Sequence, residues 1–270
     1  MPFATCNDGV RLHYEALGSG PPVILIHGWS GSSRYFAPLV PLLEPSCRVI
    51  TVDLRFHGES DKPGWGFHVA RLAADLRDLL VALDLGRQRP TVLGSSLGCA
   101  VIWSYIELFG QDSLGRAIFI DQAPSQWAMP DWAHGSKGIY DAASLANIQR
   151  ALLDMDAFAD GNAACCLSHP LPPELAASLK RETLKCDAGQ LGKLMADHAQ
   201  LDWRPILPRI TLPCLNLYGT ESGCFPVEGT RAVGELIPVC ENVAFEGCNH
   251  WLHLERPERV AELVRTFVIA

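Results

Sequence analysis

The feature that most constrains the fold is a tight serine-containing turn between a short apolar run and a pattern with helical spacing. Residues 90–93 form the apolar run, residues 94–98 read Gly-Ser-Ser-Leu-Gly, and apolar residues at helical spacing follow. The glycines two positions before and two after Ser96 leave room for the strained backbone of a sharp strand-to-helix turn. This order predicts a parallel α/β sheet with Ser96 above the carboxyl end of a strand.

The same alternation of short apolar runs and helical patterns continues along most of the chain. Helical spacing recurs at residues 69–85 and 257–268, whereas residues 10–15 alternate like an antiparallel edge strand. Runs rich in Val, Ile and Leu have the length of buried strands and lie near residues 22–26, 48–52, 90–93, 117–120, 214–217 and 243–245. We therefore predict the α/β class, with a mostly parallel central sheet flanked by helices.

One long interval breaks this alternation. Residues 122–212 contain several helical patterns but no convincing strand. Because the apolar runs resume after it, we expect a helical cap inserted after the strand that ends near Asp121. The core would then comprise residues 1–121 and 213–270. A chain of 270 residues with 48% hydrophobic composition can bury one such core without a second full domain.

Charge and composition narrow the class of partner. The formal net charge is -8 and the sequence pI is about 5.6, which disfavours nucleic acid and anionic membranes because both attract basic surfaces. The N-terminus lacks the pattern of a signal peptide, and no stretch approaches the roughly 20 apolar residues of a membrane span. We expect a cytoplasmic protein whose partner is a small-molecule substrate, with no nucleic acid or membrane partner, and we allow for a homodimer.

The cysteines do not indicate a cofactor. All 10 are scattered through the chain without the linear spacing of a metal site. The adjacent Cys165 and Cys166 would bridge poorly. The serine turn also lacks the lysine and the glycine spacing that phosphates require. We expect reduced thiols, no metal and no cofactor.

A serine on such a turn becomes a nucleophile when a base can reach it. His250 lies on a loop just after the last apolar run. A neutral imidazole there can take the proton of Ser96 and return it to a leaving group. His253 is the competing base, but it begins the final helical pattern and is expected to be a surface or packing residue.

Two backbone N–H groups are expected to form an oxyanion hole. Leu97 begins the helix after the serine turn, so its amide points toward the developing charge and the helix dipole adds to the field. The loop at residues 27–33 is rich in Gly and Ser, which lets Trp29 N–H approach the nucleophile closely. His27 in the same loop is expected to be a structural hydrogen-bonding residue rather than a base.

Four segments together resemble the α/β-hydrolase superfamily over nearly the whole chain. They are His-Gly-Trp at 27–29, Asp-Leu-Arg-Phe-His-Gly-Glu-Ser at 53–60, Gly-Ser-Ser-Leu-Gly at 94–98 and Glu-Gly-Cys-Asn-His at 246–250. The chain is most similar to the esterase, lactonase and non-haem haloperoxidase-like branch. The resemblance implies an α/β-hydrolase fold, with the segment at 53–60 as a structural loop without a catalytic role.

The catalytic acid departs from the family pattern. Members usually carry it in Gly-Asp-x-Asp-x-x-x-Pro after the strand that here ends at Gly219, but this chain reads Gly-Thr-Glu-Ser-Gly-Cys-Phe-Pro. The usual acid position therefore falls on Ser222, which cannot stabilise an imidazolium. Asp121 and Glu221 are the two candidates. We favour Asp121 because functional groups gather at the carboxyl ends of strands, and some members take their acid from this earlier strand.

A serine hydroxyl, a loop histidine, a carboxylate and two backbone donors suit acyl transfer to water. We expect a serine hydrolase that acts on a small, apolar ester or lactone through Ser96, His250 and Asp121. One alternative is a cofactor-independent ring-cleaving dioxygenase of the 3-hydroxy-4-quinolone type, in which the histidine and the acid deprotonate the substrate and the serine orients it. Another is a hydrolase-like ligand receptor that turns over slowly.

The interval expected to form the cap carries most of the candidate substrate-binding residues. Four aromatic side chains there favour a small, apolar, aromatic-lined pocket, although packing within the cap would explain each of them singly. They are Trp127, Trp132, Phe158 and Trp203.

Overall fold

The computed structural model describes residues 2–269, which form an eight-stranded sheet. The strands run in the order β1-β2-β4-β3-β5-β6-β7-β8, with β1–β2 and β2–β4 antiparallel and all other pairs parallel. Their bounds are β1 (Phe3–Thr5), β2 (Arg11–Leu17), β3 (Pro22–Ile26), β4 (Arg48–Val52), β5 (Thr91–Ser95), β6 (Arg116–Ile120), β7 (Cys214–Gly219) and β8 (Cys240–Phe245). The prediction of a mostly parallel α/β sheet is confirmed.

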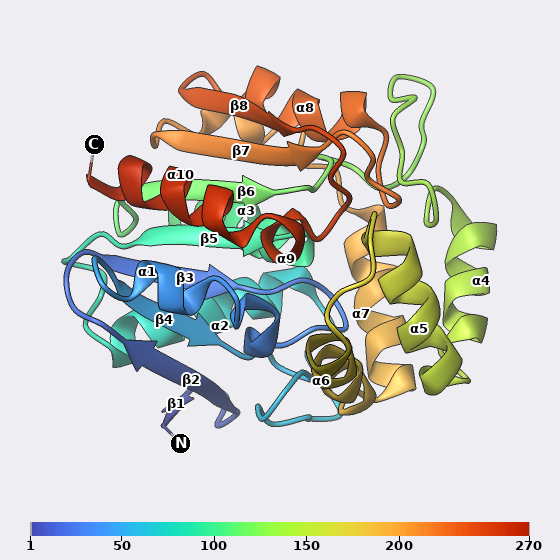
Figure 1. Ribbon diagram of the computed structural model, residues 1–270, viewed down its shortest axis with the longest axis horizontal. Helices are drawn as coiled ribbons and strands as arrows, with labels where there is room; N and C mark the ends of the chain where they lie inside the picture. The colour runs from blue at the N-terminus through green and yellow to red at the C-terminus, as the bar shows by residue number, and fades with distance from the viewer. Residues whose placement is uncertain (1, 270) are drawn as a thin grey trace.

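The central strands are buried because helices cover both faces of the sheet. Side chains alternate along β3: Ile24 and Ile26 join one apolar cluster, and Val23 and Leu25 join another on the opposite face. The first cluster includes side chains of α2 (Val69–Ala82), α3 (Leu97–Phe109) and α8 (Val227–Leu236). The second includes side chains of α1 (Val40–Leu43), α9 (Leu252–Glu255) and α10 (Pro257–Ile269), and Figure 1 shows α1 and α10 in front of the sheet.

Four α-helices and a short 3-10 helix at Leu207–Arg209 lie between β6 and β7 in the chain. The α-helices are α4 (Ala142–Ala151), α5 (Met155–Cys166), α6 (Pro173–Leu184) and α7 (Ala188–Gln200). Three of them begin at an aspartate whose carboxylate accepts from a backbone N–H three residues later, as N-caps do: Asp141, Asp154 and Asp187. The parallel strands point toward these helices, which therefore stand over the carboxyl edge of the sheet (Figure 1).

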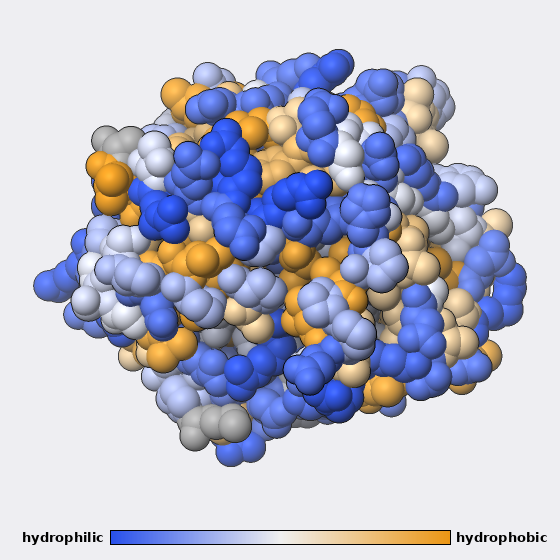
Figure 2. All heavy atoms as spheres, viewed as in Figure 1, coloured by the Kyte–Doolittle hydropathy of each residue, from blue (hydrophilic) through white to orange (hydrophobic). Residues whose placement is uncertain are grey.

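The outer surface is mostly polar on the face shown in Figure 2, where apolar side chains form small separate patches among hydrophilic ones. All ten cysteines are free thiols. Among the helices formed by residues 2–269, none combines the length and the apolar character needed to span a membrane.

Candidate active site

Ser96 occupies the tight turn between β5 and α3, with a positive φ of 52° and ψ of -119°. Residues other than glycine rarely adopt such a backbone, so the surrounding structure must hold it in place. A Cβ on Gly94 would collide with the backbone of Gly98, and one on Gly98 would collide with the carbonyl oxygen of Ile26. The two glycines are therefore needed to bring the serine turn against β3.

His250 and Asp121 meet in the interior, as the sequence analysis favoured. His250 Nδ1 lies 2.6 Å from Asp121 Oδ2, and both side chains are almost fully buried. Asp121 follows β6 directly, and its other carboxylate oxygen accepts from Gly219 N–H at 3.0 Å. A carboxylate held in this way fixes the orientation and tautomer of the imidazole, with Nε2 on the side away from Asp121.

The position that the family pattern assigns to the acid also contacts Asp121. Ser222 Oγ donates to Asp121 Oδ2 at 2.7 Å. Glu221, the other candidate acid, lies next to Ser222 in the chain. Among the described residues it makes no side-chain hydrogen bond to His250. The structure therefore brings Asp121 to the histidine and not Glu221.

The electrostatics of His250 are set by two neighbours. Burial by itself lowers the pKa of His250, but the adjoining Cys224 and the hydrogen bond to Asp121 outweigh it and raise the pKa above its ordinary value. The competitor His253 lies in α9, where its ring packs against Phe36 with 5.2 Å between centroids. Burial lowers the pKa of His253 to about 3, so it stays neutral as a packing residue.

The Ser96 hydroxyl faces the same cavity as His250. Its only hydrogen-bond partner within residues 2–269 is Gln122 Oε1, at 3.5 Å. The direct bond from Ser96 to His250 is thus not formed in this structure. Catalytic hydrogen bonds of this kind are often long without substrate and tighten in the complex.

The two expected oxyanion donors belong to backbone segments next to Ser96. Leu97 is the first residue of α3, where backbone N–H groups have no acceptor within the helix. The loop that carries Trp29 passes directly over the serine, since a Cβ on Gly28 would lie 3.2 Å from Ser96 Cβ. His27 anchors this loop: its Nε2 accepts from Leu54 N–H at 3.0 Å. The backbone thus offers positive charge next to the serine oxygen.

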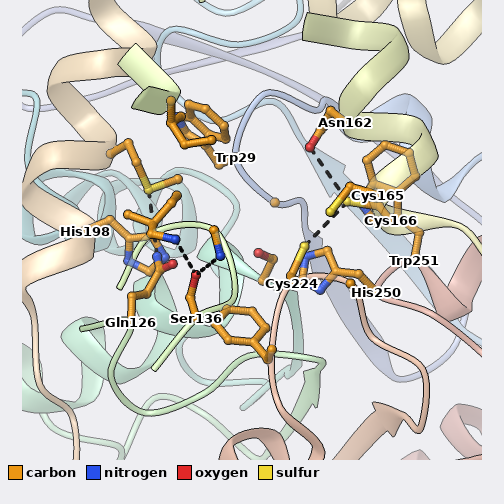
Figure 3. Close-up of a pocket in the computed structure, with 18 of the residues that line it drawn as sticks. Trp29, Gln126, Ser136, Asn162, Cys165, Cys166, His198, Cys224, His250 and Trp251 are labelled. Carbon is orange, nitrogen blue, oxygen red and sulfur yellow. Dashed lines mark hydrogen bonds between the residues drawn. The ribbon is translucent and has the colours of Figure 1, made fainter. Parts of the chain in front are cut away.

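The cavity above Ser96 has a volume of about 130 Å³ and lies between the sheet edge and helices α4, α5 and α7. Figure 3 shows Trp29, Cys224, His250 and Trp251 among the side chains that surround it. None of its lining residues is a lysine, arginine, aspartate or glutamate. Its larger apolar lining residues are Trp29, Ile139, Ile148, Phe158, Met195, Phe225 and Trp251.

Of the four aromatic residues expected to bind substrate, only Phe158 lines this cavity. Trp127 packs in a cluster with Ile139 and Met195, in the layer behind the lining. Trp132 contacts a cluster around Phe225, and its ring lies under the guanidinium of a neighbouring arginine. The expectation needs correction at these positions, because each indole is used to fill a gap between elements.

Trp203 needs the same correction. It belongs to the large cluster beneath the sheet, with its ring centroid 6.2 Å from that of Trp103. Conversely, Trp29 contributes its side chain as well as its backbone: its indole donates to Leu191 O at 3.1 Å and packs edge-on against Phe158. From the sequence, only the backbone N–H of Trp29 was assigned a role.

Sequence reasoning missed two groups of the cavity altogether. Cys224 lies beside His250, and His198 lines the opposite part of the cavity (Figure 3), where its buried Nδ1 has no hydrogen-bond partner among residues 2–269. Burial lowers the pKa of His198 to about 4, so this ring is neutral. No local pattern marks either residue, because each is brought to the site from a different part of the chain.

Comparison with known proteins places this geometry in a family. Residues 21–257 match the family model of the alpha/beta hydrolase fold. A pimeloyl-[acyl-carrier protein] methyl ester esterase from Vibrio vulnificus is 24% identical, over 95% of this chain and 97% of its own. A non-heme chloroperoxidase from Kitasatospora aureofaciens is 26% identical, over 93% and 92%.

A solved structure agrees with these relatives. An esterase from Exiguobacterium antarcticum has the same fold, with a TM-score of 0.93 over 99% of both chains and 23% sequence identity. The resemblance inferred from the four sequence segments is thereby confirmed. The chain belongs to the α/β-hydrolase fold family.

Proposed function

We propose that the protein is a serine hydrolase that cleaves a small, apolar ester or lactone through an acyl-enzyme. Ser96 is the nucleophile, His250 the general base and acid, and Asp121 the carboxylate that orients the imidazole. The observation that carries the proposal is the buried 2.6 Å contact between Asp121 and His250, beside a cavity that also exposes the strained Ser96.

The coarse class, hydrolysis of a carboxylic ester, is supported by the relatives. They include a methyl ester esterase that aligns over nearly the whole of both chains. The family supports many chemistries, so the reaction must be argued from the side chains at the site. A serine at the elbow, rather than an aspartate, suits acyl transfer.

The first half of the reaction forms the acyl-enzyme. Ser96 Oγ attacks the substrate carbonyl carbon while His250 Nε2 takes the hydroxyl proton. The N–H groups of Leu97 and Trp29 donate to the resulting oxyanion. The tetrahedral intermediate then collapses, its C–O bond to the alcohol breaks, and His250 returns the proton to the alcohol oxygen. With a lactone, that alcohol stays tethered to the acyl group.

The second half of the reaction hydrolyses the acyl-enzyme, with water in place of the serine hydroxyl as the attacking group. Water gives a proton to His250 Nε2 and attacks the acyl carbon, and the bond to Ser96 Oγ breaks as the proton returns to the serine. Asp121 stays ionised throughout and stabilises the imidazolium that forms in each half. The product is a free carboxylic acid.

The cavity lining sets the substrate class. A space of about 130 Å³ without lysine, arginine, aspartate or glutamate in its lining fits a short or compact uncharged acyl group. Phe158 and Trp29, packed edge to face at 5.4 Å, form an aromatic wall. We therefore favour small aliphatic or aromatic esters and small lactones over charged or long-chain esters.

The test is active-site labelling of the whole chain. A fluorophosphonate probe should form one adduct, on the peptide containing Ser96, and the label should be absent in Ser96→Ala. Ser95→Ala is the matched control, because Ser95 is the buried final residue of β5 and should leave labelling intact.

Labelling should be followed by hydrolysis assays with ester and lactone panels. Loss of turnover in Ser96→Ala, with the fold retained by circular dichroism, is the expected result. No adduct on the folded wild-type protein would overturn the proposal. The ring-cleaving alternative would then be tested by oxygen uptake with 3-hydroxy-4-quinolones.

A further inference from the structure

Two cysteines that the proposed reaction does not use lie beside the imidazole of His250. Cys166 ends α5, and Cys224 lies in the loop between β7 and α8. Their sulfur atoms are 3.6 Å apart, although 58 residues separate them in the chain. One ring nitrogen of His250 and the two sulfurs all lie within 4.8 Å of one another. Figure 3 shows Cys166 and Cys224 next to His250.

We propose that Cys166 Sγ, Cys224 Sγ and His250 Nε2 form a binding site for a thiophilic divalent metal ion, with Zn²⁺ as the probe. Two thiolates and an imidazole are the ligands that such ions prefer. Around a tetrahedral zinc ion with bonds of about 2.3 Å, two sulfurs would lie about 3.8 Å apart. The observed separation of 3.6 Å needs almost no adjustment to reach that geometry.

The imidazole is already oriented as metal ligands are. Its Nδ1 is engaged by Asp121 at 2.6 Å, so Nε2 is the nitrogen left for a metal. Metal-binding histidines usually donate their other N–H to a carboxylate, which fixes the ring and increases its basicity. The contact that orients His250 for catalysis therefore also prepares it as a ligand.

The backbone holds both sulfurs in place. The carbonyl of Cys166 accepts from Trp251 N–H at 3.0 Å, which joins the end of α5 to the loop of His250. The carbonyl of Cys224 accepts from Lys137 N–H at 2.8 Å. Preorganised ligands lose little entropy on binding. All three residues line the cavity, so we expect water from the cavity to be the fourth ligand.

Binding has a defined consequence for the hydrolase. The thiols bind as thiolates and release their protons to the buffer, and no electron transfer is involved. The metal occupies Nε2, the atom that must accept the proton of Ser96, so the bound form cannot start acyl transfer. This consequence rests on the proposed function, whereas the metal site itself does not.

The experiment measures binding directly on the reduced, metal-stripped full-length chain. Isothermal titration with Zn²⁺ and native mass spectrometry should show one equivalent bound, and Cd²⁺ should produce thiolate-to-metal charge-transfer absorption. Cys166→Ser and Cys224→Ser should each weaken Zn²⁺ binding by about tenfold or more. Cys240→Ser is the matched control, since Cys240 lies at the start of the edge strand β8, away from the cavity.

A second control tests whether the adjacent pair Cys165 and Cys166 binds the metal instead of Cys166 and Cys224. Cys165→Ser should retain Zn²⁺ binding. The proposal would be overturned if binding were lost in Cys165→Ser but kept in Cys224→Ser. A folded wild-type chain that binds no Zn²⁺ in titration would also overturn it. If Cys224→Ser fails to fold, Cys166→Ser and Cys166→Ala give the same comparison.

Activity provides a separate readout. Adding Zn²⁺ should inhibit wild-type hydrolysis, and chelation should restore it. The ratio of rates with and without metal should move toward one in Cys166→Ser. A chain that binds Zn²⁺ through these ligands but hydrolyses no ester would retain the metal site and reject the proposed function. Hydrolysis that continues at the same rate with the site fully occupied would reject the inhibitory consequence.

Discussion

Ser222 Oγ donates a hydrogen bond to Asp121 Oδ2 at 2.7 Å, and the same carboxylate oxygen lies 2.6 Å from His250 Nδ1. The loop after β7, where related hydrolases are expected to carry their acid, here supplies a hydroxyl that hydrogen-bonds to Asp121 at the end of the neighbouring strand, the residue proposed as the acid. The carboxylate next to His250 and the hydroxyl that donates to it thus come from the ends of two adjacent strands. This arrangement can be tested by substitution at each position.

Asp121→Asn should lower kcat by on the order of 10⁴-fold, because an amide stabilises the wrong tautomer and cannot stabilise the imidazolium. Ser222→Ala should lower it by roughly tenfold, since it removes one hydrogen bond to a charged group. Glu221→Gln should leave kcat unchanged and serves as the control. Steady-state kinetics on a cleaved ester would contradict this assignment if the effects of Asp121→Asn and Glu221→Gln were reversed.

A carboxylate introduced at position 222, after β7, should be able to replace that of Asp121, after β6. The double variant Asp121→Asn, Ser222→Asp places a carboxylate where the hydroxyl now contacts Asp121, at 2.7 Å from the present acid. We expect it to recover at least about tenfold of the kcat lost in Asp121→Asn, because a carboxylate there can again orient His250. A double variant no faster than the single one would show that the loop geometry has lost this role.

Phe158 should determine substrate size. Phe158→Ala removes part of the aromatic wall and enlarges the cavity, so kcat/KM for bulkier acyl groups should rise relative to that for acetyl esters. Trp203→Phe is the control: it changes the cluster beneath the sheet and should alter stability rather than selectivity. Equal changes in selectivity for both variants would place Phe158 outside the acyl site.

The turn at Ser96 should not tolerate a side chain at Gly98. Gly98→Ala places a methyl group against the carbonyl oxygen of Ile26 and should cost about 3 kcal/mol or more in unfolding free energy. Gly161→Ala, an exposed position in α5 with nothing near its Cβ, should stabilise the chain by about 1 kcal/mol. Urea unfolding of the two variants measures both values, and equal stabilities would contradict the steric argument.

Acid should destabilise the fold through buried neutral histidines. Burial lowers the pKa of His57 and His253 to about 3 and that of His198 to about 4. As the pH falls below about 6.5, the unfolded chain takes up protons that the folded chain does not, so stability falls from there toward pH 4. The raised pKa of His250 acts in the opposite sense and offsets part of this loss.

The loss for each of these histidines should be roughly 2 kcal/mol at pH 5. Urea unfolding between pH 5 and 7 should therefore give a free energy that rises with pH. His253→Gln removes one of the groups and should flatten the curve. A curve equally steep in this variant would show that other groups dominate the acid response.

Local sequence determined the helices and strands and the tight turn at Ser96, the proposed nucleophile. Runs of Val, Ile and Leu are buried wherever a parallel sheet is covered on both faces, so the predicted runs at 22–26 and 48–52 coincide with β3 and β4. The steric need for glycine around Ser96 acts over five residues, and it can therefore be read without the fold. The strand β1 was missed because three residues carry too little periodicity.

Tertiary structure alone decided how the site is completed. Asp121 and His250 are 129 residues apart, and Cys166 and Cys224 are 58 apart, so no short pattern links either pair. Strand order brings β6 next to β7 and so sets Ser222 against Asp121. Packing of α5 and α7 over the sheet decided that Phe158 lines the cavity while Trp127, Trp132 and Trp203 do not. Sequence periodicity tells which face of an element is apolar, but the contact that each apolar residue makes depends on neighbours that only the folded chain supplies.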